Sequence, residues 1–121
     1  MEALTHAEAK RLWRRSIKEA WSNCCAYCGN PPIDDKSLTI DHVKPRSHGG
    51  EDLRSNVVPA DRKCNHLKGS TEWRSWYRQQ DFYEVWREYR IEYWLKHDIV
   101  LSEEESRQKS IRHLGGSDLF E

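Results

Sequence analysis

The stretch from Ser37 to Gly69 constrains the fold of this chain more than any other part of the sequence. Two short strands, SLTIDHV and NVVP, are predicted on either side of a loop that contains Gly49-Gly50. A short helix, ADRKCNHLK, follows and is predicted to end at Gly69 as its C-terminal cap. Strand, loop, strand and helix in this order predict a compact ββα unit over about residues 37–69.

Helices are predicted on both sides of this unit. Thr5 and Glu8 form a capping box ahead of the first helix, and Asp81 and Glu84 form another ahead of the aromatic-rich segment FYEVWREYRIEYW. The chain has six Trp and five Tyr but is only 36% hydrophobic, so its core is expected to depend on aromatic burial and on a staple. We therefore expect an α+β fold that is mainly helical.

The distribution of charge divides the chain into two parts. Residues 1–96 carry seventeen basic and fourteen acidic side chains, whereas residues 97–121 carry three basic and six acidic ones. The length fits one domain. We expect a single domain over residues 1–97 and an acidic, flexible C-terminal tail over residues 98–121.

Four cysteines, Cys24, Cys25, Cys28 and Cys64, bear on the compartment and on metal binding. The N-terminal sequence is charged and lacks the apolar core of a secretory signal, and no apolar run has the length of a membrane span. We therefore expect a soluble protein of the cytoplasm or nucleus. In such a chain, C-x-x-C indicates metal binding or redox chemistry rather than a disulfide framework.

The segment IDHVKPRSHGGEDLRSNVVPADRKCNHLKG contains several polar motifs in a fixed order. Asp-His is followed by Pro and Gly-Gly, then by Asn-Val, and then by Cys-Asn-x-x-Lys-Gly. This order resembles the HNH endonuclease family. The preceding CAYCG and the downstream aromatic segment look like the small HNH proteins encoded by bacteriophages, which implies action in the cytoplasm of a host cell.

The chemistry of phosphodiester hydrolysis supports the same interpretation. The reaction needs a base that removes a proton from the attacking water and a cation that neutralises the negative charge developing on the phosphate. His42 is the candidate base, and the oxygens of Asp41 and Asn65 suit Mg²⁺ or Mn²⁺. The resemblance implies that Asn56 pins the loop and orients the base. Because strict alternation would send Asp41 and His42 to opposite faces, we expect the strand to end or twist there.

The resemblance also implies a structural zinc site. Zinc-bearing family members supply two C-x-x-C pairs, and here the matching pairs are Cys25 with Cys28 and Asp61 with Cys64. A carboxylate can complete a tetrahedral Zn²⁺ site, and the i, i+3 spacing places Asp61 and Cys64 on one helix face. Alternatively, Asp61 is the N-cap of the helix, and zinc would then use Cys24 or a water, or be absent.

The main hypothesis is a metal-dependent DNA endonuclease or nickase with a one-metal mechanism and His42 as general base. The main alternative is a non-catalytic, zinc-stapled module that binds nucleic acid or assists DNA packaging. A third and weaker hypothesis is a thiol redox protein. The expected partners are DNA and phage terminase proteins, and no association with a membrane is expected. The protein is expected to be a monomer or a weak dimer. The candidate DNA contacts are basic residues on three predicted helices, Arg14, Arg15, Lys68 and Arg74.

Overall fold

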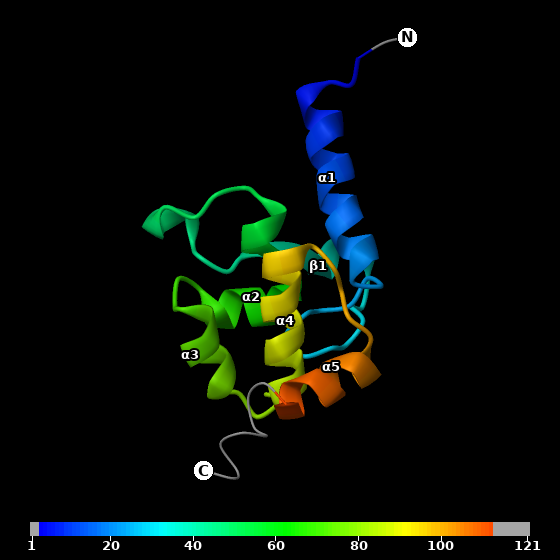
Figure 1. Cartoon of the computed structure of the whole chain (residues 1–121). Helices are drawn as coiled ribbons and strands as arrows, with labels where there is room; N and C mark the ends of the chain where they lie inside the picture. Colours follow the sequence, from blue (N-terminus) through cyan, green and yellow to red (C-terminus); the bar gives the residue numbers. More distant parts are fainter. Residues whose placement is uncertain (1–2, 113–121) are drawn as a thin grey trace.

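The computed structural model describes residues 3–112, and its centre is the predicted ββα unit (Figure 1). Strand β1 (Leu38–His42) pairs in antiparallel register with β2 (Val57–Asp61), so that His42 lies opposite Val57. Helix α2 (Arg62–Lys68) follows β2 directly and ends at Gly69, which has the positive φ of 55° expected of a cap. The predicted α+β fold is confirmed.

A loop over residues 43–56 joins the two strands. It contains two single-turn 3₁₀ helices, η2 (Arg46–His48) and η3 (Arg54–Asn56), and another, η1 (Asp35–Ser37), precedes β1. The backbone amide of Val43 donates to the carbonyl of Asn56 at 2.9 Å, which closes the base of the loop. The loop is therefore ordered, and it starts and ends at the end of the hairpin where His42 pairs with Val57.

Helix α1 (His6–Ala20) extends away from the hairpin (Figure 1). The capping box between Thr5 and Glu8 forms as predicted, with the Thr5 hydroxyl accepting from the Glu8 amide at 3.1 Å. Only Ile17 is buried within the helix, and Trp21 is buried just beyond its end. Helix α1 is thus anchored at its C-terminal end, while its first turns are exposed.

Helices α3 (Trp73–Arg78) and α4 (Val85–His97) carry the aromatic segment. Helix α4 begins at Val85, and its N-cap Glu84 makes no capping bond with its side chain, so the expected capping box with Asp81 does not form. The Arg78 guanidinium instead pairs with the buried carboxylate of Glu88 through bonds of 2.6 and 2.7 Å. This pair ties the start of α4 to α3.

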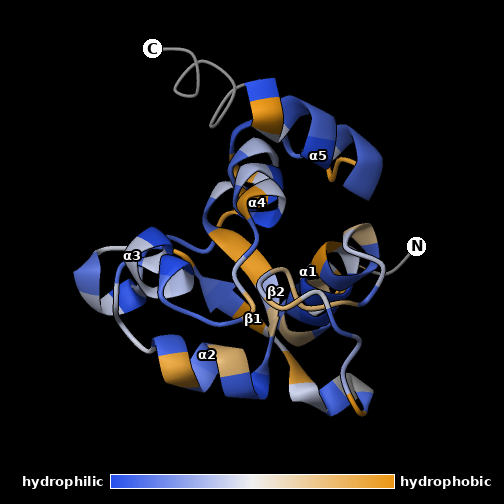
Figure 2. Ribbon diagram, turned by 90° about the horizontal axis from the view of Figure 1, so that it is seen from below, coloured by the Kyte–Doolittle hydropathy of each residue, from blue (hydrophilic) through white to orange (hydrophobic). Residues whose placement is uncertain are grey.

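Among the described residues, six large aromatic side chains and smaller apolar ones build the core around the hairpin, whose strands include apolar segments (Figure 2). The Tyr77 hydroxyl donates to the carbonyl of Tyr27 at 2.7 Å, and the Trp94 indole donates to the carbonyl of Val57 at 2.8 Å. The rings of Trp21 and Trp94 meet edge to face at 5.9 Å. Each buried polar tip that is bonded in this way fixes a ring against a particular backbone group.

The segment after residue 97 differs from the flexible tail predicted for residues 98–121. Helix α5 (Glu103–Ser110) packs beside α4, and Leu101 and the small Ser106 and Ser110 are buried. The Arg107 guanidinium lies 4.9 Å from the centre of the Trp86 ring. Small residues allow close packing, so an acidic sequence can still form a docked helix. The remainder of the predicted tail, residues 113–121, lies outside the described residues.

Within residues 3–112, no helix combines the length and the apolar character that crossing a bilayer requires.

Candidate metal cluster and active site

The structure brings the four predicted structural ligands together. One donor atom from each of them lies within 4.8 Å of all the others, in a cluster formed by Cys25, Cys28, Asp61 and Cys64. Cys25 and Cys28 come from the turn that precedes the ββα unit, and the other two come from the junction of β2 and α2. Three thiols and a carboxylate at this separation could hold a metal ion, and such an ion would join the turn to the unit.

Asp61 serves the helix and the cluster at once. Its Oδ1 accepts from the Cys64 amide at 2.7 Å and caps α2, whereas its Oδ2 lies 3.1 Å from the Sγ of Cys28. The two sequence interpretations, N-cap and cluster member, are therefore compatible because each uses a different oxygen. The Cys24 thiol donates to the carbonyl of Ser22 at 3.4 Å and is not part of the cluster.

The crowded thiols influence one another's protonation. Hydrogen bonds from Cys28 and Cys64 lower the pKa of the Cys25 thiol to about 4. The hydrogen bond to Cys25 raises the pKa of Cys64 well above its usual range. The cluster thus favours one thiolate, which is the ionic form that binds metal.

Strand β1 ends at His42, as the sequence predicted, and Asp41 and His42 nevertheless lie on opposite faces of the hairpin. His42 is the last residue of β1, so the side chains of Asp41 and His42 still alternate. Asp41 faces α2, where it is bonded to Lys68. His42 borders a cavity with Trp13 and Arg14 of α1. The carboxylate and the imidazole therefore have different surroundings.

The carboxylate of Asp41 is buried, and both of its oxygens are hydrogen-bonded. The Tyr27 hydroxyl donates to Oδ2 at 2.6 Å, and the Lys68 ammonium donates to Oδ1 at 3.2 Å. The same ammonium donates to the carbonyl of His42 at 3.2 Å. Burial raises the pKa of Asp41, and the charge of Lys68 and the bond from Tyr27 oppose that rise.

Asn65, the other predicted ligand of a catalytic cation, also faces β1. Its amide group donates to the Thr39 hydroxyl at 2.8 Å. The carboxylate of Asp41 and the amide oxygen of Asn65 are the donor types that a hard divalent cation prefers, so the chemistry of the pair fits. A cation at Asp41 would have to displace the ammonium of Lys68 from the carboxylate.

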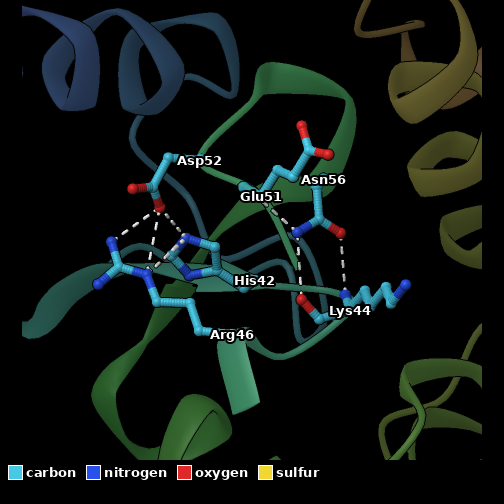
Figure 3. Close-up of polar contacts among 6 residues, drawn as sticks. All are labelled: His42, Lys44, Arg46, Glu51, Asp52 and Asn56. Carbon is cyan, nitrogen blue, oxygen red and sulfur yellow. Dashed lines mark hydrogen bonds and ion pairs between the residues drawn. The ribbon is translucent and has the colours of Figure 1, made fainter. Parts of the chain in front are cut away.

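His42 is paired with a residue that the sequence interpretation did not identify (Figure 3). Its Nε2 lies 2.6 Å from Oδ1 of Asp52, and Arg46 donates to the same oxygen from Nη2 at 2.7 Å. The hydrogen bond to His42 and the guanidinium of Arg46 hold the pKa of Asp52 below its usual range. The one signal for Asp52 is its place in the loop between Gly-Gly and Asn56.

Asn56 lies in the loop without touching His42. Its Oδ1 accepts from the Lys44 amide at 3.0 Å, and its Nδ2 donates to the carbonyls of Lys44 at 3.1 Å and Glu51 at 2.9 Å (Figure 3). These three bonds hold the two sides of the loop together. The side-chain hydrogen bonds of Asn56 therefore join parts of the loop that also carries Asp52, and none of the three reaches the imidazole.

Replacing Asn56 with Asp tests this interpretation. The variant keeps the acceptor for Lys44 but loses both donated bonds and places a carboxylate against two carbonyls. At about 1 kcal/mol for each bond, the loop should open about 30-fold more often. Hydrogen exchange at the Val43 and Lys44 amides measures this opening. Ser55→Ala, an exposed neighbour, is the control, and equal protection in both variants would contradict the assignment.

The predicted DNA contacts do not share one surface. Arg14 and Arg15 are exposed on α1, as expected. The side chain of Lys68 is fully buried, so it cannot meet a phosphate in this arrangement. Arg74 pairs with Glu92 at 3.0 Å and stacks on Trp73. Folding thus commits the last two cations to contacts within the protein.

The centre of the chain is thus a ββα unit with a cluster of four metal-type donor atoms beside it and a histidine at one end of its hairpin. Residues 25–71 match the model of the HNH endonuclease family. A stretch of 66 residues is 36% identical to the CRISPR-associated endonuclease Cas9 of Corynebacterium diphtheriae. This stretch covers 54% of this chain but only 6% of that protein. Residues 25–71 are therefore similar to an HNH endonuclease domain, and the chain spans only a small part of the length of the relative that it matches.

Proposed function

We propose that this protein is a divalent-metal-dependent DNA endonuclease or nickase with His42 as its general base. One observation carries the proposal: within the matched HNH domain, His42 borders a cavity and is held by a carboxylate. The resemblance to small bacteriophage proteins adds a proposed setting, DNA packaging beside a terminase in the host cytoplasm.

The contact with Asp52 supports Nδ1 of His42 as the proposed basic nitrogen. A carboxylate can only accept, so Nε2 of the imidazole must carry the proton that it shares with Asp52. In the neutral ring, Nδ1 is then the basic nitrogen, and it would take the proton from the attacking water. Once the ring is protonated, the negative charge of Asp52 stabilises the imidazolium.

Two further groups complete the proposed chemistry. Arg46 is exposed beside His42 and can meet a phosphate oxygen while keeping its bond to Asp52. Asp41 and Asn65 would hold Mg²⁺ or Mn²⁺, which when bound would neutralise charge on the phosphate. We also propose that the ion at the cysteine cluster is Zn²⁺, because thiolate-rich sites favour it.

One observation favours the alternative of a non-catalytic module that binds nucleic acid. Asp41 is neutralised by Lys68 on one face of the hairpin, while His42 is held by Asp52 on the other. Catalysis through both residues would require that Asp41 be released from Lys68 or that the end of β1 rearrange. A module that only binds DNA needs neither change.

A plasmid assay separates the two functions. Purified protein is incubated with supercoiled DNA in Mg²⁺, in Mn²⁺ and in EDTA, and the nicked and linear forms are quantified. We expect cleavage with either metal and none in EDTA. Cleavage that persists in EDTA would overturn the metal requirement but keep the nuclease. DNA binding without cleavage under every condition would establish the non-catalytic module.

A further inference from the structure

Helix α1 lies outside the part of the chain that matches the HNH family and has a surface that the domain's own chemistry does not explain. Its N-terminal turns project from the body (Figure 1) and bury no side chain before Ile17. A helix with so little buried surface contributes little to the core. Most of its residues are therefore not required for the hydrophobic core and can be used for binding.

A groove runs along α1 and reaches His42. One cavity of about 710 Å³ lies against α1, and a second of about 320 Å³ lies between α1 and β1. The two share Lys10, Arg14 and Lys18 as lining residues, and the second is also lined by His42 and Arg46. The two cavities thus adjoin along α1, and together they are called the α1 groove, whose second cavity is also lined by the candidate base.

The groove is strongly cationic. It contains a single acidic residue, Glu19, and the basic side chains of α1 that line it are Lys10, Arg11, Arg14, Arg15 and Lys18. Among the salt bridges of residues 3–112, none engages Lys10, Arg11, Arg14 or Arg15. Four cations without an acidic partner on one helix call for an external anion.

The spacing of these cations fits a polymeric anion. Lys10, Arg14 and Lys18 follow at i, i+4 intervals, so they lie along one side of the helix. From Lys10 to Lys18 the helix rises about 12 Å at 1.5 Å for each residue, which corresponds to three or four nucleotides of a DNA strand at about 3.4 Å each. A row of this length suits a phosphodiester backbone rather than one small anion.

We propose that the groove along α1 binds the phosphate backbone of the DNA next to the cleaved bond and leads the scissile phosphate to His42 and Arg46. The inference rests on the proposed nuclease function for its endpoint. The binding surface itself rests only on charge and shape. Helix α1 thus provides the DNA affinity that Lys68 and Arg74 do not supply.

Binding is tested without cleavage in a His42→Ala background. The triple variant R11Q/R14Q/R15Q is compared with a charge-matched control, K63Q/K96Q/R107Q, whose residues do not line the groove. Fluorescence anisotropy with a labelled DNA duplex gives Kd over a salt series. Each lost phosphate contact should reduce the salt slope by about 0.9, so we expect a reduction of two to three and about ten-fold or greater loss of affinity.

The control should keep the parent's affinity and slope, and far-UV circular dichroism should show the same helix content in all three proteins. If the groove variant binds DNA as the parent does, or if both triples lose affinity equally, the proposal is wrong. Poly-glutamate binding as tight as that of DNA would instead identify an acidic protein partner and also overturn it.

A kinetic arm with His42 intact keeps this proposal separate from the nuclease proposal. Backbone binding that is equal in the ground and transition states should raise KM and leave kcat unchanged. We therefore expect the groove variant to raise KM alone. If the parent binds DNA through the groove but does not cut it, the nuclease proposal is wrong, whereas the proposal that the groove binds DNA still holds.

Discussion

His42→Ala is expected to abolish most of the DNA cleavage, with a fall in rate of about 10² to 10⁴-fold. The variant removes the candidate group that can accept a proton from water near neutral pH and that lies at the end of the cationic groove. Because the imidazole is only partly buried and its bond partner Asp52 is exposed, its loss should cost little stability. The expected change is therefore in the rate and not in the fold.

Single-turnover cleavage of supercoiled plasmid at saturating enzyme measures this effect without a contribution from binding. His48→Ala is the matched control, because His48 is an exposed histidine of the same loop. The control should cut like the parent, and both variants should bind DNA with unchanged affinity. A His42→Ala protein that cuts within three-fold of the parent would show that the imidazole is not the base.

Cys64→Ser is expected to remove the bound metal and to destabilise the whole domain. Cys64 is buried at 3% exposure, and it lies where α2 meets the turn that carries Cys25 and Cys28. Metal that binds only the folded chain stabilises it by about 4 kcal/mol when its concentration is a thousand times Kd. Loss of one ligand should forfeit most of this energy, because the pairs on either side of the metal are no longer joined.

Elemental analysis and urea unfolding measure the two effects. The parent should contain one zinc ion for each chain and the variant none, and a strong chelator should lower the parent's stability toward that of the variant. Cys24→Ser is the control, because this thiol lies next to the cluster in sequence but outside it in space. A parent protein without metal after purification and refolding with Zn²⁺ would exclude a structural zinc site.

Both predictions start from motifs that are visible in the sequence. The ββα unit could be predicted because Gly49-Gly50, the two strand runs and Gly69 are local signals, and the structure places β1, β2 and α2 within one or two residues of them. The cluster could be predicted because Cys25 with Cys28 and Asp61 with Cys64 have spacings that a turn and a helix start convert into shared faces. The distance along the chain is short within each pair, whereas the meeting of the two pairs was implied by the family resemblance.

The remaining features depended on contacts between distant segments. Side-chain alternation follows from the strand, but the fact that β1 continues through His42 depends on its pairing with Val57. The burial of Lys68 against Asp41 depends on how α2 packs on β1, and Leu101 is buried by the docking of α5 near α4. The order of residue types along the chain does not specify which distant segments pack against each other.

The amino-acid sequence was sufficient for the ββα order, because local turn and cap signals set it, and the order of its motifs supplied the family resemblance that implied the four residues of the metal cluster. The direction in which each charged side chain points was decided in three dimensions. Asp52 reaches His42, and Lys68 turns inward while Arg14 faces the groove, because burial and pairing of charge depend on which surfaces meet. Electrostatic partners are chosen by proximity in space, which is established only when the helices pack.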